Sequence, residues 1–158
     1  MFFLGLDCST QSLSALLIEF KSHRIIWEHS IIFESTFPEY RTRSGTLQAP
    51  SSLVVHSPPM MWLEALDALF KAMQTSHIDL KQIQAIAGSA QQHGSVYLKK
   101  QFASKIAHLD PNKTLKENLQ GTLARQTAPI WMDASTAQEC LEIKQAVGQK
   151  VILISKHS

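Results

Sequence analysis

Three apolar runs open the chain and are separated by short polar breaks. Residues 2–6, 13–20 and 24–34 are rich in Phe, Leu, Ile and Trp, and the segments DCSTQS and KSHR lie between them. Runs of this length between turn-forming residues are typical of strands, and connections this short join antiparallel neighbours. The pattern therefore predicts three consecutive antiparallel strands.

The strand pattern stops in a long loop, residues 35–57, which holds prolines, one glycine and many hydroxyl residues. A loop of this length inside a compact domain is usually functional or disordered. A helix should follow it, with Ser57 as the N-cap and Pro58 at the first helical position. Apolar residues then recur at helical spacing at Trp62, Ala65, Leu66, Leu69, Phe70 and Met73. We interpret this stripe, including Trp62 and Met73, as core.

The rest of the chain alternates between predicted strands and helices. Apolar runs predict strands at residues 83–88, 95–98 and 128–132. Thr114 and Glu117 have the spacing of a capping box and should start a short helix. A final helix follows Ser135 and should end at Gly148. Its apolar face holds Ala137, Cys140, Leu141 and Val147.

This order of elements predicts an α/β fold, in which helices cover a mixed sheet and ligands collect at strand ends. Polar residues gather after three of the predicted strands, at residues 7–11, 91–94 and 133–136. If the three strand ends lie on one edge of the sheet, Asp7, His93 and Asp133 should face a common cleft.

Composition excludes several classes of protein. The 158 residues are 44% hydrophobic and 18% charged, which fits one ordinary globular domain with its own core. The net charge is +2 and the basic residues are scattered, so we expect no nucleic-acid partner. The first apolar run is too short for a membrane span and lacks the basic start of a signal peptide. Cys8 and Cys140 form no CxxC pair, which favours a reducing, cytoplasmic location.

The first polar cluster, Asp7 followed by Cys8, Ser9, Thr10 and Gln11, has two interpretations. Asp, Ser and Thr form hairpin turns readily, because their side chains bond the local backbone. The same residues suit a phosphate site, in which N–H groups and hydroxyls face the anion and the carboxylate holds a metal. Taken alone, the stretch favours the hairpin, since it lacks the glycines of a P-loop.

Four segments together carry a resemblance to a known family. LGLDCSTQS, SPPMMW, AIAGSAQQHGSVYLK and APIWMDAST resemble the N-terminal half of the FGGY carbohydrate kinases, especially the eukaryotic xylulose kinases. The loop TFPEYRTRSG also matches that subgroup, and the resemblance runs from about residue 3 to about residue 148. It implies a ribonuclease-H-like, actin-like fold, of which residues 1–158 are an incomplete first domain. The tail at 149–158 lies outside the resemblance, and the second, nucleotide-binding domain has no counterpart.

The resemblance implies a phosphate side and a sugar side for the site. Asp7 takes the place of the family's first-turn aspartate, near Mg²⁺ and the transferred phosphoryl group, and Ser9, Thr10 and Gln11 form the phosphate-facing turn. Phosphoryl transfer depends mainly on such positioning and charge neutralisation. Gln92 and His93 match the dipeptide that contacts the sugar, and Asp133 lies close to the sugar pocket.

Each assignment has a structural alternative. Asp7 can simply cap its turn, His93 can be a hairpin residue, and Asp133 stands where a helix N-cap belongs. Cys8 has no partner base in view, so we interpret it as a packing residue rather than a nucleophile.

The implied function is that of an ATP- and Mg²⁺-dependent kinase that converts D-xylulose to D-xylulose 5-phosphate. The family's catalytic base lies in a later segment without a counterpart here, so we expect the chain alone to be inactive. The alternatives are a kinase of glycerol, ribulose or gluconate, and a non-enzymatic sugar-binding or interaction module. Surface left uncovered by a missing part should also favour a homo-oligomer.

Overall fold

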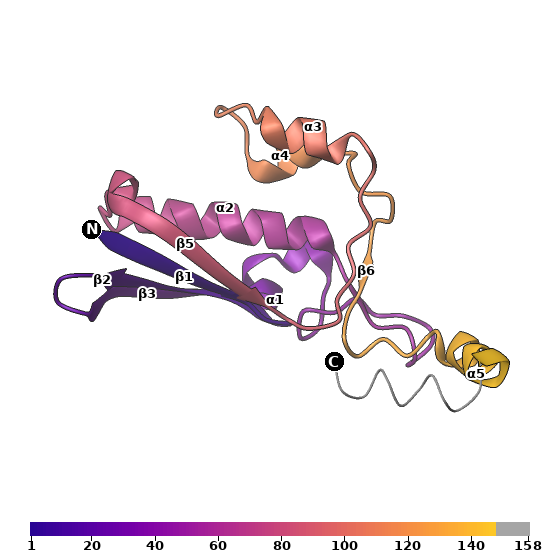
Figure 1. Cartoon of the computed structure of the whole chain (residues 1–158). Coiled ribbons are helices and arrows are strands. Elements are labelled where there is room, and N and C mark those ends of the chain that lie inside the picture. The colour runs from indigo at the N-terminus through magenta and orange to yellow at the C-terminus, as the bar shows by residue number, and fades with distance from the viewer. Residues whose placement is uncertain (148–158) are drawn as a thin grey trace.

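The computed structural model describes residues 1–147, and its centre is a four-stranded mixed sheet (Figure 1). Strands β1 (Phe2–Cys8), β2 (Ser12–Glu19) and β3 (Arg24–Ile32) are antiparallel neighbours, as predicted. Strand β5 (Ile83–Ala90) lies on the other side of β1 and runs parallel to it. The order is therefore β3-β2-β1-β5, and the expectation of an α/β fold with a mixed sheet is confirmed.

Helix α2 (Pro59–Thr75) covers one face of the sheet and makes the core (Figure 1). Its stripe of Met61, Ala65, Leu69 and Met73 is fully buried against sheet residues such as Leu4 and Leu17. Trp62 is partly buried beside this core. The helix begins one residue later than predicted, because Pro58 has the extended backbone of an N-cap and Pro59 is the first helical residue.

The segment between β3 and α2 is mostly irregular, as predicted, but its ends are ordered. Strand β3 stops at Ile32, two residues earlier than expected, because fully buried Phe33 begins the short helix α1 (Phe33–Thr36). The 3-10 helix η1 (Pro38–Tyr40) follows, and the two-residue strand β4 (His56–Ser57) precedes α2.

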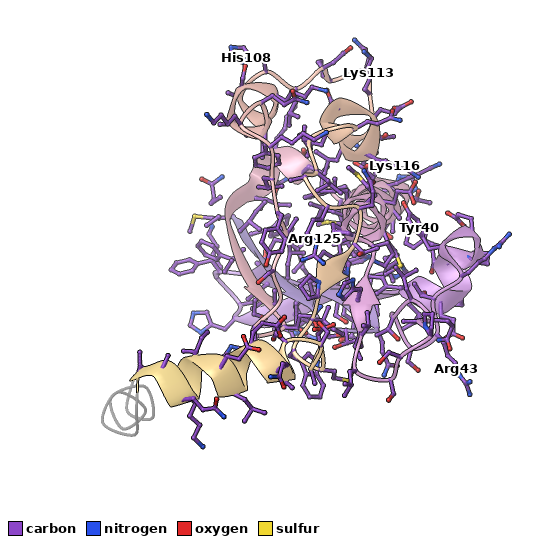
Figure 2. The ribbon with its side chains drawn as sticks, turned by 90° about the vertical axis from the view of Figure 1, so that its right-hand side faces the viewer. Tyr40, Arg43, His108, Lys113, Lys116 and Arg125 are labelled. Carbon is purple, nitrogen blue, oxygen red and sulfur yellow. The ribbon has the colours of Figure 1, made fainter. Side chains whose placement is uncertain are left out.

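After β5 the chain leaves the sheet and forms an arm that holds α3 (Phe102–Ala107) and α4 (Leu115–Leu119) (Figure 1). The predicted capping box of α4 is present between Thr114 and Glu117. Lys116 fixes the arm to the body: it pairs with Glu64 of α2, and its Nζ lies 5.2 Å from the centroid of the Tyr40 ring (Figure 2).

Of the predicted strands in this second half, one is absent and one is shorter than expected. Residues 95–98 form no strand, and Leu98 makes only an isolated bridge with Leu123. Val96 and Leu98 instead line a cavity of about 240 Å³ with Trp62, Phe102 and Leu119. The predicted strand at 128–132 shrinks to β6 (Ala128–Pro129), which pairs antiparallel with β4 and not with the main sheet.

Two further helices complete the described chain. The 3-10 helix η2 (Leu80–Gln82) leads into β5, and α5 (Ala137–Val147) forms where a last helix was predicted. The apolar residues of α5 are exposed: Leu141 by 52% and Val147 by 50%. Its predicted end at Gly148 lies outside the described residues. No helix within residues 1–147 is both long and apolar enough to span a membrane.

Candidate functional site

Parallel pairing brings the first two polar clusters to the same end of the sheet. Asp7 of β1 pairs with Ser89 of β5, and Cys8 pairs with Ala90. The Gln91 backbone N–H continues this ladder and donates to the Cys8 carbonyl at 3.0 Å. The carboxyl ends of parallel strands lie at the same end of a sheet. The turn at residues 7–11 and the segment at 91–94 therefore leave the sheet side by side.

Asp7 lies at this edge with an exposed side chain. Its Oδ1 accepts a hydrogen bond from the Ser89 hydroxyl of the neighbouring strand. An aspartate that only closed a turn would instead bond its own backbone. The carboxylate is thus held from β5 and remains open to solvent.

The turn after β1 is closed by two serines. The Ser9 backbone N–H donates to the Ser12 carbonyl at 2.9 Å, and the Ser9 hydroxyl accepts from the Ser12 N–H at 3.3 Å. Gln11 has an exposed side chain, while its carbonyl accepts from the Phe33 N–H at 3.0 Å. The turn is therefore anchored at both ends, and its tip consists of Thr10 and Gln11.

Thr10 links the first polar cluster to the second cluster and to the segment just before the third. Its hydroxyl donates to Oε1 of Gln91 at 3.4 Å and accepts from the indole N–H of Trp131 at 3.1 Å. Trp131 stands two residues before Asp133 in the third cluster and is 56% exposed. The three segments therefore converge, even though the third does not follow a strand of the main sheet.

Gly45 of the loop at residues 35–57 lies against the backbone of the turn after β1. A Cβ atom on Gly45 would overlap the Thr10 carbonyl oxygen and lie 2.8 Å from the Thr10 carbonyl carbon. Gly45 also has φ +79°, which favours glycine. The buried Ser57 hydroxyl holds it in place by donating to the Gly45 carbonyl at 2.7 Å.

Gln92 and His93 extend beyond the sheet edge and are exposed. Within residues 1–147 their side chains make no hydrogen bond, and His93 has φ +59°. The segment returns to the body at Ser95, whose N–H donates to the Pro129 carbonyl at 3.0 Å. Both side chains are therefore presented to solvent from a fixed backbone.

The Asp133 carboxylate is nearly buried, with 6% of its side chain exposed, and it is committed to protein partners. Oδ2 accepts from the Val55 N–H at 2.8 Å and lies 3.2 Å from Nε2 of His56, while Oδ1 accepts from the Ser135 N–H at 3.1 Å. Burial alone would raise the pKa of Asp133, but hydrogen bonds from Ser135 and Val55 and the nearby His56 together lower it. Asp133 thus fastens the third cluster to the segment before α2. It does not cap α5, which begins four residues later.

A cavity of about 170 Å³ lies beside the two strand ends and is lined by Cys8, Trp62, Ala90, Gln91, Gly94 and Val96. Burial, with a smaller contribution from the Asp7 charge, raises the pKa of the Cys8 thiol to about 11. The thiol therefore stays neutral at ordinary pH. This agrees with the interpretation of Cys8 as a packing residue.

The residues at the carboxyl ends of β1 and β5 offer one carboxylate to a metal ion. Within residues 1–147 no group of three His, Cys, Asp or Glu side chains is arranged to bind an ion. Mg²⁺, however, commonly takes one or two carboxylates and fills its other positions with water and substrate phosphates. A single exposed carboxylate such as Asp7 fits that arrangement.

Sequence reasoning missed three residues of the site: Ser89, Trp131 and Gly45. The first two carried a weak signal, since each stands at the end of an apolar run where polar or amphipathic side chains reach the surface. Gly45 carried none, because its role depends on a contact with a turn 35 residues earlier.

Residues 2–109 match the N-terminal domain of the FGGY family of carbohydrate kinases. The chain belongs to this family. It is 37% identical over 147 residues to xylulose kinase 2 of Arabidopsis thaliana and 36% identical over 145 residues to the xylulose kinase of Rattus norvegicus. These matches cover 92% of this chain but 26% and 27% of those proteins, so the chain spans about a quarter of their length.

Solved structures agree on the fold. The chain superposes on the crystal structure of a xylulose kinase from Rhodospirillum rubrum with a TM-score of 0.61 and 18% sequence identity. The match covers 97% of this chain and 25% of that one. The expected sugar-kinase fold is thereby confirmed for the first part of the domain.

Proposed function

We propose that this chain is the N-terminal part of an ATP-dependent D-xylulose kinase, which transfers the γ-phosphoryl group of ATP to D-xylulose and releases D-xylulose 5-phosphate. Family membership and the identity to xylulose kinases support the reaction class. The observation that carries the proposal for this chain is the convergence on Thr10. The first two polar clusters and Trp131, two residues before the third cluster, meet there at one end of the sheet.

The turn after β1 is the proposed phosphate side. Asp7 holds Mg²⁺, which supplies charge neutralisation for the transferred phosphoryl group when it is bound. Thr10 and Gln11 at the tip, with Ser9 shaping the turn, face the phosphate oxygens. The hydrogen bond from Ser89 keeps the Asp7 carboxylate in one position while leaving it exposed.

The segment after β5 is the proposed sugar side. Gln92 and His93 have exposed side chains next to the turn, so their donors and acceptors are available to the hydroxyl groups of a ketose. Asp133 contributes indirectly, because it holds the segment that carries Trp131 against the segment before α2. Its own oxygens are already bonded to Val55 and Ser135.

The direct test is a chimera in which this chain replaces the matching N-terminal quarter of Arabidopsis thaliana xylulose kinase 2. ADP formation is measured with D-xylulose, D-ribulose, glycerol and gluconate, each at several concentrations. We expect D-xylulose to give the highest kcat/KM. A His93→Ala chimera should lose activity mainly through a higher KM, as removal of a binding contact predicts.

A folded chimera that prefers glycerol, D-ribulose or gluconate would show that the chain serves another kinase of the family. A folded chimera with no activity on any of these substrates, checked by circular dichroism, would support the alternative of a non-enzymatic module.

A further inference from the structure

The imidazole ring of His56 is hydrogen bonded from both sides. Its Nε2 lies 3.2 Å from Oδ2 of Asp133, and its Nδ1 lies 2.9 Å from the hydroxyl oxygen of Thr127. Thr127 directly precedes β6, whereas Asp133 follows it. The ring is mostly buried, with 16% of the side chain exposed. His56 therefore ties the segment before α2 to the chain on both sides of β6.

The two partners determine which ring nitrogen of a neutral His56 carries the proton. The Asp133 carboxylate, whose pKa is lowered, is ionised and can only accept, so Nε2 donates to it. Nδ1 of the neutral ring is then an acceptor, and the Thr127 hydroxyl donates to it. The ring thus gives one hydrogen bond and receives another. A glutamine side chain offers the same pair of groups, an N–H and an oxygen on one carbon.

Backbone hydrogen bonds already align the two segments that the ring joins. The Ile130 N–H donates to the Val55 carbonyl at 3.1 Å, and the Ala134 N–H donates to the Leu53 carbonyl at 2.9 Å. Strands β4 and β6 pair antiparallel at the same place. Trp131 lies inside this bonded stretch, so its backbone is fixed relative to the segment before α2.

Two sets of contacts lead from His56 to the turn after β1. On one side, the segment bonded to the ring carries Trp131, whose indole N–H donates to the Thr10 hydroxyl at 3.1 Å. On the other side, the next residue, Ser57, donates to the Gly45 carbonyl at 2.7 Å. Gly45 in turn lies against the backbone of Thr10. The side chain and the backbone of Thr10 are therefore both supported from the neighbourhood of His56.

We infer that His56 is a positioning residue for the turn after β1. Its two hydrogen bonds keep the Trp131 segment against the segment before α2, and this arrangement fixes Thr10 at the tip of the turn. A displacement of about 1 Å in a positioning group can cost about 10²-fold in rate. The consequence for catalysis rests on the proposed kinase function, whereas the consequence for the position of Trp131 does not.

The first test follows the Trp131 indole N–H by NMR in the 158-residue chain. Thr10→Val gives the position of this resonance without its hydrogen bond. We expect His56→Leu to shift the resonance toward that position, because both bonds of the ring are lost. His56→Gln should leave it at the wild-type position. The indole N–H of Trp27, which donates to the Ser76 hydroxyl at 3.2 Å, is the internal reference and should not shift.

The second test measures kcat and KM for D-xylulose in the chimera with Arabidopsis thaliana xylulose kinase 2. His56→Leu should lower kcat at least ~tenfold and change KM by less than ~twofold, because the phosphate side is displaced and the sugar contacts are kept. His56→Gln should retain the kcat of the unmodified chimera. The matched control is His108→Leu, since Nδ1 of His108 donates to the Ser104 carbonyl at 2.9 Å in the arm. Both constants should stay unchanged in this control.

Thr127→Val is a second variant in case His56→Leu disturbs folding. It removes one of the two bonds of the ring and should shift the Trp131 resonance in the same direction, by a smaller amount.

A Trp131 resonance that stays at the wild-type position in folded His56→Leu or Thr127→Val would overturn the inference. An effect of His56→Gln as large as that of His56→Leu would also overturn it, because the donor and acceptor would then not matter. An inactive unmodified chimera would instead refute the proposed kinase function, and the NMR result would still decide the role of His56.

Discussion

The contact between Gly45 and Thr10 is the most demanding requirement on a single residue of the candidate site. It places the long loop directly behind the turn that carries Asp7, and it combines a positive φ with an approach that excludes a Cβ atom. Gly121 offers a natural comparison. Its φ of +78° is nearly the same, but no atom lies within 4 Å of the Cβ position.

Gly45→Ala should therefore destabilise the chain more than Gly121→Ala. Both substitutions place a side chain in the left-handed region, at a cost of about 1–2 kcal/mol. Gly45→Ala adds an overlap with the Thr10 backbone, worth a further ~1–3 kcal/mol. Urea unfolding followed by circular dichroism measures both. Equal losses of unfolding free energy for the two variants would mean that a Cβ atom at position 45 does not clash with the Thr10 backbone.

Asp133 leads to a prediction about acid stability. Because hydrogen bonds lower its pKa in the folded chain, the ionised carboxylate stabilises the fold at pH values above the ordinary aspartate pKa. That stabilisation is lost as the pH falls through the lowered pKa. Asp133→Asn should reduce the free energy of unfolding at neutral pH by about 1–3 kcal/mol, since charge-assisted hydrogen bonds to Val55 and Ser135 are weakened.

The matched control is Asp79→Asn, because Asp79 caps η2 through the Lys81 N–H and asparagine caps equally well. The difference between wild type and Asp133→Asn should shrink at acid pH. A difference that stays constant from neutral to acid pH would show that the Asp133 charge makes no contribution.

Among the elements, α5 stands out because none of its residues is buried within residues 1–147. All residues of Ala137–Val147 are exposed, and Ile143 is exposed by 62%. An isolated helix of this length is marginal in water, since most helix stability comes from packing. The apolar face of α5 is thus not buried in the described part of the chain.

Ile143→Lys should change the free energy of unfolding by no more than ~0.5 kcal/mol, as expected for an exposed site. Leu69→Ala, on the buried face of α2, should cost about 2–5 kcal/mol. Chemical denaturation compares the two. A loss of more than ~1 kcal/mol for Ile143→Lys would show that α5 packs against the rest of the chain in solution.

The elements that the sequence predicted well are those whose pattern has a local cause. The first three strands alternate or cluster apolar residues, and α2 and α4 carry a helical stripe or a capping box. The errors at residues 95–98 and 128–132 have a shared origin. Apolar side chains of the first segment line a cavity, and the second segment pairs with the short distant strand β4; periodicity cannot separate either case from a buried strand.

The candidate site shows the same difference between features with a local cause and contacts between distant segments. The ends of β1 and β5 could be placed together from the strand order, and the structure confirms that pairing. The links from Thr10 to Trp131 and from Gly45 to Thr10 could not, because they join residues far apart through irregular segments. The roles proposed for Asp7, Gln92 and His93 remain predictions.

For the whole molecule, the chain spans about a quarter of the length of its relatives. The family resemblance places the base that accepts the proton of the sugar hydroxyl in a later segment. We therefore expect the 158-residue chain alone to show no measurable ATP-dependent phosphorylation of D-xylulose in a coupled assay. Turnover at roughly 1–100 per second, as in ordinary kinases, would refute this.

We propose that the Asp7 turn is a phosphoryl-transfer site and not merely a hairpin. The most direct measurement is kcat for D-xylulose phosphorylation by the chimera with Arabidopsis thaliana xylulose kinase 2, with and without Asp7→Asn. Asparagine is nearly isosteric and can still accept from Ser89, so the fold and the melting temperature should be unchanged. Removing the charge should lower kcat by about 10²–10³-fold, while Asp79→Asn leaves it unchanged. Equal kcat values for Asp7→Asn and the unmodified chimera would show that the turn is only a hairpin.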